Sequence, residues 1–252
     1  MPLTRRDGSV PLTRRLLAEL VGTLLLVTVV VGSGVAAQRL SPHDVGLQLL
    51  ENSVATMLGL AVLILALGPV SGAHLNPVVS AADWLLGRRA GAGLSGRDAA
   101  AYSLVQTVGG VAGAELANIM YAVPLHLSSH QRTGPHLWLG EIVATAGLVG
   151  LIFALARTGR GALAGPAVGA YIGAAYWFTS STSFANPAVT VGRLFSDTFS
   201  GIAASSVAGF VVAQVIGAGV GLGLVCLLYP DAGVTAAEAR ASEAPTAAVE
   251  RP

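Results

Sequence analysis

Two short stretches, Ser71-Gly-Ala-His-Leu-Asn76-Pro77-Val78 and Thr182-Ser-Phe-Ala-Asn186-Pro187-Ala188, decide the fold of this chain. Asn is a favoured helix N-cap, and Pro is favoured at the first helical position because its missing N–H is not needed there. Each Asn-Pro pair therefore predicts the start of a helix. The apolar runs 76–86 and 186–196 are too short to cross a bilayer, so the two stretches predict a pair of half-helices inside a membrane.

The composition is that of a membrane protein with several spans. Of 252 residues, 53% are hydrophobic and only 11% are charged, and the mean hydropathy is +0.69. Soluble domains carry about 25% charged residues. The net charge of +1 and the lack of a basic face give no sign of nucleic-acid binding. A single cysteine, Cys226, excludes an internal disulfide or a cysteine metal cluster and is expected to be a core residue. We expect no metal and no cofactor.

Six stretches are long and apolar enough to span a bilayer. They are 16–37, 47–69, 98–123, 137–156, 163–180 and 201–229. The segment 1–15 precedes the first span, which is too long for the core of a signal peptide. The tail 231–252 is rich in Ala, Glu and Pro and is predicted to be disordered. The channel-forming domain is therefore expected to be 16–230.

The arginines predict the orientation, because the chain contains no lysine. With a cytoplasmic N-terminus, only Arg39, Arg132 and Arg193 fall outside the cell. The arginines that then fall inside are Arg5, Arg6, Arg14, Arg15, Arg88, Arg89, Arg97, Arg157, Arg160, Arg240 and Arg251. Positive residues favour the cytoplasmic side, so we expect both termini in the cytoplasm and the protein in the inner membrane.

The sequence repeats itself in two halves, 16–125 and 136–230. Each half keeps the order glutamate, Asn-Pro, glutamine: Glu19 and Gln106 in the first, Glu141 and Gln214 in the second. Three spans per half is an odd number, so the second half is inverted in the membrane. Inverted repeats with interrupted segments at matching positions indicate that the conducting site lies at those segments.

The two half-helices predict a pore that excludes cations. The irregular segments 68–75 and 179–185 are tolerated at membrane depth only if they are buried in protein or line a water-filled cavity. Entering from opposite sides, the half-helices abut N-terminus to N-terminus at the midplane, and each N-terminus carries about half a positive charge. The amides of Asn76 and Asn186 offer donors to a passing oxygen. Neutral hydroxylated solutes are expected to pass while protons are not.

Glu19 and Glu141 are carboxylates within predicted spans, where ionisable groups are costly and usually functional. We interpret them as braces for the two re-entrant loops, whose exposed carbonyl groups need partners. The alternative is that both lie near helix ends and are solvated.

These motifs resemble the aquaporin family, the major intrinsic proteins, over about residues 14–230. The resemblance implies an all-α membrane protein with six spans and two re-entrant half-helices in a 3+3 inverted repeat, assembled in the lipid bilayer as a homotetramer with one pore per subunit. It implies a passive channel for small neutral solutes and no enzyme activity. It places at the pore midplane Asn76, Pro77, Val78, Asn186, Pro187 and Ala188, and it places His74 in the cytoplasmic vestibule.

The chain departs from the family at the outer constriction, the selectivity filter. Val78 stands where the motif usually has alanine. Val189 stands where water-selective members have an arginine, which predicts a wider and less polar pore. Counting as in the family gives Thr56 and Ser183 as two further filter positions. The fifth-span position is Ala174 by ungapped counting, or Tyr176 or Trp177 if the glycine-rich start of that span is matched instead.

The cargo stays open at this point. Thr190 replaces the aspartate that usually follows the filter arginine in glycerol channels, and the string around Asn186 resembles bacterial members linked to arsenic resistance. The resemblance implies water, uncharged polyols or a neutral metalloid such as arsenite. The alternatives are a water-selective or glycerol channel with an atypical filter and, from another class, an ion-coupled secondary transporter.

Two features have both a functional and a structural interpretation. Arg193 lies one helical turn beyond Val189 and either replaces the lost charge at the pore mouth or anchors the end of the half-helix. The histidines His126, His130 and His136 suggest metal binding or, more simply, a solvated loop.

Overall fold

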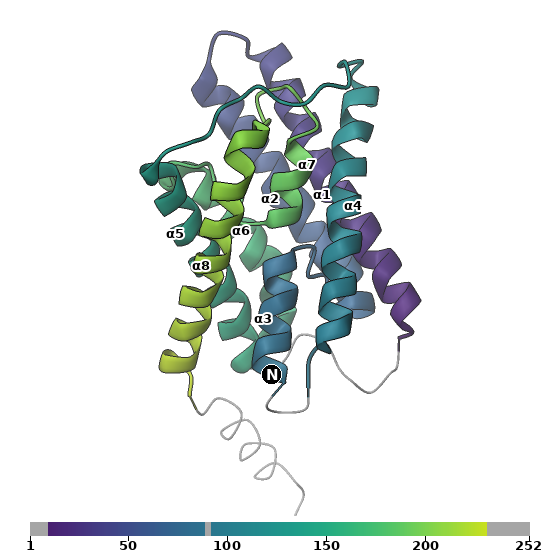
Figure 1. The fold of residues 1–252 in the computed structure, drawn as a ribbon, viewed down its shortest axis with the longest axis vertical. Coiled ribbons are helices and arrows are strands. Elements are labelled where there is room, and N and C mark those ends of the chain that lie inside the picture. The colour runs from purple at the N-terminus through teal and green to yellow at the C-terminus, as the bar shows by residue number, and fades with distance from the viewer. Residues whose placement is uncertain (1–9, 89–91, 231–252) are drawn as a thin grey trace, which may run out of the picture.

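The computed structural model describes residues 10–88 and 92–230 (Figure 1). Their regular structure consists of eight α-helices and one 3-10 turn, with no strand in these two ranges. The helices are α1 (Leu12–Leu40), α2 (Val45–Ser71), α3 (Pro77–Gly87), α4 (Gly96–Met120), α5 (Pro135–Arg157), α6 (Ala164–Phe178), α7 (Pro187–Arg193) and α8 (Ala204–Leu228). The predicted tail 231–252 and most of the predicted segment 1–15 lie outside the described residues.

The six long helices surround two short ones, α3 and α7, as the inverted repeat predicts (Figure 1). In Figure 1, α3 lies in the lower half of the bundle and α7 in the upper half, and their N-terminal ends face each other near the middle. We call the end of the bundle where α1 begins the lower end and the opposite end the upper end. The predicted all-α architecture of six spans and two half-helices is confirmed.

Four of the helices, α1, α2, α5 and α8, are individually long and apolar enough to cross a membrane. The other two long helices, α4 and α6, complete the bundle but do not meet the length and hydropathy criteria on their own. The hydropathy of α4 is lowered by glycines and by polar residues such as Gln106 and Asn118. Helix α6 has only 15 residues, shorter than the predicted 163–180, and follows the 3-10 turn Gly161–Leu163.

The first re-entrant loop is shorter than predicted. Helix α2 continues through Pro69 to Ser71 and ends at Gly72, whose φ of 89° lies in the left-handed region that favours glycine at a helix end. Irregular backbone therefore begins at Gly72 rather than at residue 68. At the other end of the repeat, α7 stops at Arg193, before the predicted residue 196.

Glycines allow the helices of each half to approach closely. In each half the first long helix packs against the third, α1 against α4 and α5 against α8. A Cβ atom on the glycines of α4 or α8 would lie within 2.5 Å of a carbonyl oxygen on the facing helix: Gly109 near Leu20, Gly113 near Leu24, Gly217 near Ile142 and Gly221 near Ala146. Small residues four apart are typical of close helix contacts in membranes.

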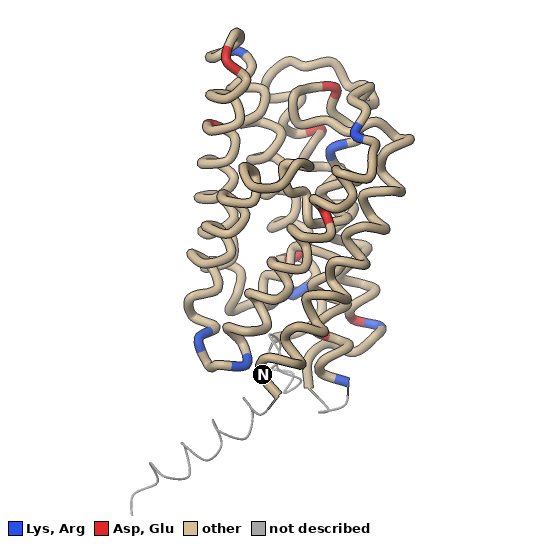
Figure 2. The backbone as a smooth tube through the Cα atoms, turned by 90° about the vertical axis from the view of Figure 1, so that its left-hand side faces the viewer, with Lys and Arg blue, Asp and Glu red and all other residues tan. Residues whose placement is uncertain are grey.

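Charged residues gather at the two ends of the bundle (Figure 2). Most described arginines lie at the lower end, at the start of α1, the end of α3, the start of α4 and the end of α5. The prediction for Cys226 is wrong, because this side chain is exposed on the outer surface of α8. An apolar run in a membrane helix does not distinguish the lipid-facing side from the core, since both are apolar.

Candidate functional site

The two asparagines cap the half-helices. The Oδ1 atom of Asn76 accepts a hydrogen bond from the backbone N–H of Val78 at 3.1 Å. The Oδ1 atom of Asn186 accepts from Ala188 at 2.9 Å and from Val189 at 3.3 Å. Since N-cap side chains satisfy the unpaired N–H groups of the first turn, each Asn-Pro pair starts its helix as the sequence indicates.

The same side chains join the two re-entrant loops. The Nδ2 atom of Asn76 donates to the carbonyl oxygen of Ala185 at 2.8 Å, and the Nδ2 atom of Asn186 donates to that of Leu75 at 2.7 Å. The N-termini of α3 and α7 therefore meet at one place. Each amide nitrogen uses one of its two N–H groups in this way, which leaves the second for another acceptor.

The two loops share an unusual backbone conformation. Ala73 and Leu75 have φ values of 47° and 48°, and the matching residues Ser183 and Ala185 have 50° and 48°. Residues other than glycine rarely adopt such angles, and each instance costs on the order of 1–3 kcal/mol. Such a conformation persists only where its surroundings hold it.

Glu19 holds the first loop. Its Oε1 atom accepts hydrogen bonds from the Ser71 hydroxyl at 2.6 Å and the His74 N–H at 3.0 Å. Its Oε2 atom accepts from the Leu75 N–H and from Nε2 of Gln106, both at 2.7 Å. The carboxylate is completely buried. One side chain thus binds the strained loop to α1 and α4.

Glu141 holds the second loop in the same way. Its Oε1 atom accepts from the Ser181 hydroxyl at 2.7 Å and the Phe184 N–H at 2.8 Å. Its Oε2 atom accepts from the Ala185 N–H at 2.8 Å and from Nε2 of Gln214 at 2.6 Å. This carboxylate is also completely buried, so the alternative of solvated glutamates is wrong. The expected chemistry was also incomplete, because a carboxylate accepts hydrogen bonds and pairs with loop N–H groups, not carbonyls.

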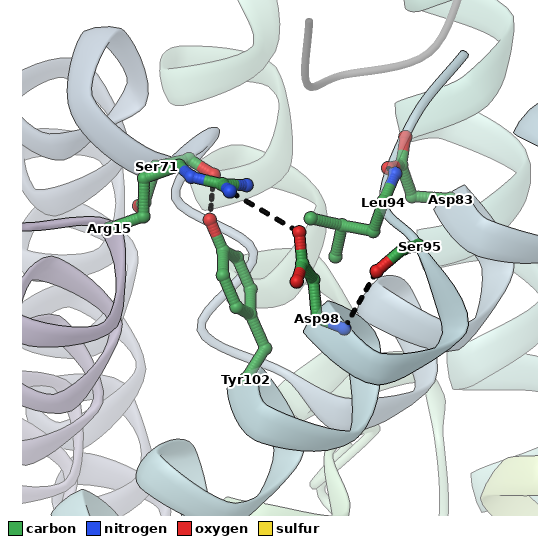
Figure 3. Close-up of polar contacts among 7 residues, drawn as sticks. All are labelled: Arg15, Ser71, Asp83, Leu94, Ser95, Asp98 and Tyr102. Carbon is green, nitrogen blue, oxygen red and sulfur yellow. Dashed lines mark hydrogen bonds and ion pairs between the residues drawn. The ribbon is translucent and has the colours of Figure 1, made fainter. Parts of the chain in front are cut away.

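A polar network supports the first loop at the lower end (Figure 3). The Tyr102 hydroxyl donates to the carbonyl oxygen of Ser71 at 3.0 Å, and the Tyr102 ring lies edge-on to His74, with the ring centroids 5.4 Å apart. Arg15 pairs with Asp98 at 3.2 Å beside this tyrosine. The start of α4 and the start of α1 are therefore both connected to the loop.

The second half replaces this network with apolar contacts. Phe210 stands where Tyr102 stands in the first half, four residues before the glutamine. It packs edge-on against Phe184, with the ring centroids 5.0 Å apart. The two halves thus share the glutamate brace but differ in chemistry at the Tyr102 and Phe210 position.

A cavity runs beside the half-helices. One wall comes from the two loops and α7, with Asn76, Asn186, His74, Ser183 and Val189 among its residues. The opposite wall is built from helix residues spaced four apart: Leu26 and Val30 of α1; Thr56, Leu60 and Ile64 of α2; Leu148 and Ile152 of α5; and Val168, Ile172 and Tyr176 of α6. The loop side of the cavity therefore carries most of its polar groups, and the helix side is mostly apolar.

Two polar atoms in this cavity have no hydrogen-bond partner within the described ranges. They are the Ser183 Oγ and the His74 Nε2, both on buried side chains. The other nitrogen of His74, Nδ1, lies 3.1 Å from the Ser80 hydroxyl. Buried polar atoms without a partner are costly, so each of these two atoms has an unmet hydrogen bond.

Four of the predicted midplane residues do not line this cavity. Pro77, Val78, Pro187 and Ala188 belong to the first turns of α3 and α7 but are absent from its walls. Val78 and Ala188 are buried in packing contacts instead. The valine at position 78, which departs from the family motif, therefore belongs to the buried core and not to the cavity lining.

Of the three candidates for the fifth-span position, Tyr176 lines the cavity, and Ala174 and Trp177 do not. Tyr176 is buried, lines the cavity and places its hydroxyl 3.2 Å from the Thr56 hydroxyl. Ala174 is exposed on the outside of α6. It lies two residues from Ile172, which rotates it by about 200° away from the cavity-facing stripe. Trp177 is also exposed, and its Nε1 donates to the Ser53 hydroxyl at 3.2 Å.

Hydrogen bonds connect the α4–α5 and α7–α8 loops at the upper end of the bundle. Ser129 donates to Asp197 through its N–H at 2.9 Å and its hydroxyl at 3.0 Å, and these two bonds lower the pKa of the Asp197 carboxyl. Arg132, which the sequence analysis used only to predict the orientation, donates to the carbonyl oxygens of Gly201 and Phe199 at 2.8 and 3.0 Å. These contacts join the α4–α5 connection to the α7–α8 connection.

The histidines of the α4–α5 region do not converge. His126, His130 and His136 all have exposed side chains. Within residues 10–88 and 92–230, no group of three or more His, Cys, Asp or Glu side chains is arranged to hold a metal ion.

The family model described as "Major intrinsic protein" matches residues 8–185 of this chain. This range contains the first half of the repeat and the Glu141 brace with its loop. The chain belongs to the major intrinsic protein family. The arrangement of capped half-helices, crossed asparagines and buried glutamates is thus that of a major intrinsic protein.

Several characterised major intrinsic proteins are similar to this chain. It is 50% identical over 221 residues to Aquaglyceroporin AqpS of Rhizobium meliloti (strain 1021), covering 87% of this chain and 92% of that protein. It is 34% identical to the Glycerol uptake facilitator protein of Pseudomonas aeruginosa over 62% of each chain. The solved aquaglyceroporin from Plasmodium falciparum matches with a TM-score of 0.64 at 20% identity, covering 88% of this chain and 99% of that one, which shows the shared fold.

Proposed function

We propose that this channel conducts small neutral polyhydroxylated solutes larger than water, and that undissociated arsenous acid is among them. The observation that carries the proposal is the two-sided cavity, which presents the Asn76, Asn186 and Ser183 groups opposite apolar stripes from four helices. A polyol has hydroxyl groups on one side of its carbon chain and C–H groups on the other. Undissociated arsenous acid presents three hydroxyl groups in a similarly small neutral molecule.

The filter composition supports cargo larger than water. Thr56, Tyr176, Ser183 and Val189 all line the cavity, and valine lacks the long, charged side chain that water-selective members have at this position. Relatives named as an aquaglyceroporin and a glycerol uptake facilitator support the same class of cargo. A strictly water-selective channel is the alternative.

Cations are excluded at the point where α3 and α7 meet. Both half-helices direct their positive N-terminal ends there, joined by the two asparagine amides. The residues lining the cavity include no aspartate or glutamate that would compensate this potential. A secondary transporter would need an ionisable coupling site, and an enzyme would need a nucleophile with a base. The lining holds no carboxylate for ion coupling, and Ser183 and His74, a hydroxyl and an imidazole, come from different loops, so we assign a passive, non-catalytic pore.

We place the lower end of the bundle in the cytoplasm and the channel in the inner membrane. The support is the excess of arginines at that end (Figure 2). This orientation puts both termini inside the cell and the Val189 filter at the outer mouth. A homotetramer with one pore per subunit is the assembly we propose, on the family resemblance.

Stopped-flow light scattering on proteoliposomes tests the function. We expect the purified channel to speed entry of glycerol and arsenous acid relative to empty liposomes, while a pH dye inside shows no added proton flux. Substantial proton conductance would contradict the midplane barrier. Fast water flux without glycerol flux would favour the water-selective alternative.

Thr56→Phe is expected to reduce glycerol permeability about tenfold and water permeability less, because a ring on this buried position narrows the cavity beside Tyr176. The matched control is Leu58→Phe on the same helix, whose side chain is 56% exposed and faces away from the cavity. Both variants are compared with the unmodified channel at equal amounts in liposomes. Equal glycerol permeability in Thr56→Phe and Leu58→Phe would place Thr56 outside the rate-limiting constriction.

A further inference from the structure

Arg193 lies inside the solute cavity although it stands four residues beyond the usual filter position. Its side chain is only 3% exposed, and it lines the cavity together with Val189. Residues i and i+4 lie on the same face of a helix, one turn apart. The guanidinium therefore occupies the face of α7 that Val189 leaves open.

The guanidinium is held in a fixed orientation. Its Nε donates to the carbonyl oxygen of Ser200, and its central carbon lies 3.4 Å from the centroid of the Phe184 ring. Ser200 is in turn fixed against α1, because its hydroxyl donates to the carbonyl oxygen of Val30 at 3.1 Å. A Cβ on Gly34 would lie 2.2 Å from that hydroxyl oxygen, so the contact depends on a glycine.

The charge of Arg193 has no carboxylate partner. Within the described ranges the ion pair is that of Arg15 with Asp98, at the other end of the bundle. No hydrogen bond from Nη1 or Nη2 of Arg193 is present in the described part of the chain. Neither nitrogen is among the fully buried polar atoms that lack a hydrogen-bond partner. Arg193 lines the cavity, so these two nitrogens are the groups that it can present to a solute.

We propose that Arg193 supplies the positive charge of the outer constriction. Two residues of this channel then set the width and the charge of the constriction, which a single arginine sets in water-selective members. Val189 sets the width, and Arg193, one turn nearer the mouth, repels cations and donates hydrogen bonds to the oxygens of a solute. The inference rests on the proposed function and deepens it. It assigns as cargo neutral solutes with several oxygen acceptors, admitted through a wide but positively charged mouth.

Arg193→Met and Arg193→Lys in the full-length channel test this role. Arg193→Met keeps an unbranched side chain and removes the charge and the N–H donors. We expect glycerol permeability to fall, because hydrogen-bond donors to the solute are lost, while entry of the methylammonium cation rises at least about tenfold. Arg193→Lys keeps the charge and is expected to keep methylammonium excluded. A residue that only clamps the Ser200 loop predicts that Arg193→Lys and Arg193→Met conduct alike, and that result would overturn the proposal.

A second measurement needs no solute flux. Val189→Arg alone places two guanidiniums one turn apart in a buried site, so we expect a marked fall in the unfolding temperature in detergent. Combining it with Arg193→Met is expected to recover most of that loss, and a double-mutant cycle isolates the coupling. Additive effects would show that the two positions do not share the constriction. If the unmodified channel conducts no glycerol, the proposed function fails while this coupling still decides the placement of Arg193.

Discussion

Replacing Glu19 with alanine is expected to abolish the folded channel. The carboxylate accepts four hydrogen bonds, from Ser71, His74, Leu75 and Gln106. Removing it leaves buried N–H groups without acceptors at the strained loop, and breaking a buried charged network costs on the order of 3–5 kcal/mol. That is a large fraction of a total stability of about 5–15 kcal/mol. Glu141→Ala should act in the same way on the second loop.

The unfolding temperature in detergent and the yield of monodisperse protein measure this effect. Glu19→Gln is expected to have an intermediate effect. Its amide keeps one acceptor oxygen, but its NH2 group faces N–H or O–H donors that the second carboxylate oxygen accepted from. Glu115→Gln is the matched control, since its Oε2 atom on α4 makes no hydrogen bond within the described residues. A Glu19→Ala channel as stable as Glu115→Gln would refute the brace.

Gly221→Ala is expected to prevent α5 and α8 from packing. The added Cβ would lie 2.5 Å from the carbonyl oxygen of Ala146, and backbone of a facing helix cannot move aside as a flexible side chain can. Overpacking typically costs about 1–3 kcal/mol and more where backbone must shift. The corresponding change in the first half, Gly113→Ala, meets the Leu24 carbonyl oxygen at 2.2 Å and should have a similar effect.

Gly223→Ala on the same helix is the control, because nothing lies within 4 Å of its added Cβ. Both changes raise helix propensity equally, so their difference reports only the helix contact. Expression in membranes and the unfolding temperature measure it. If Gly221→Ala and Gly223→Ala match in both, the close approach of α5 and α8 does not limit stability.

The positions that sequence reasoning misjudged share one cause. Val78, Ala174 and Cys226 lie in apolar helices where every face is apolar, so hydropathy gives no sign of which side meets the cavity, the core or the lipid. The signal that distinguishes Tyr176 is the four-residue spacing of Val168, Ile172 and Tyr176 on one stripe. Gln106 and Gln214 appeared in the repeat, but their bonds to the glutamates required knowing which helices pack together.

The sequence by itself determined the half-helices, the internal repeat and the family, because N-caps, apolar run lengths and duplicated motifs are local properties of the chain. The tertiary structure decided how each helix is rotated about its axis and what its side chains reach. The rotation of α6 about its axis follows from its packing on α2, where a Cβ on Gly169 would lie 2.5 Å from the Met57 carbonyl oxygen, and this rotation places Tyr176 in the cavity wall. The position of Arg193 likewise depends on Phe184 and Ser200, which meet it only because three separate segments fold together.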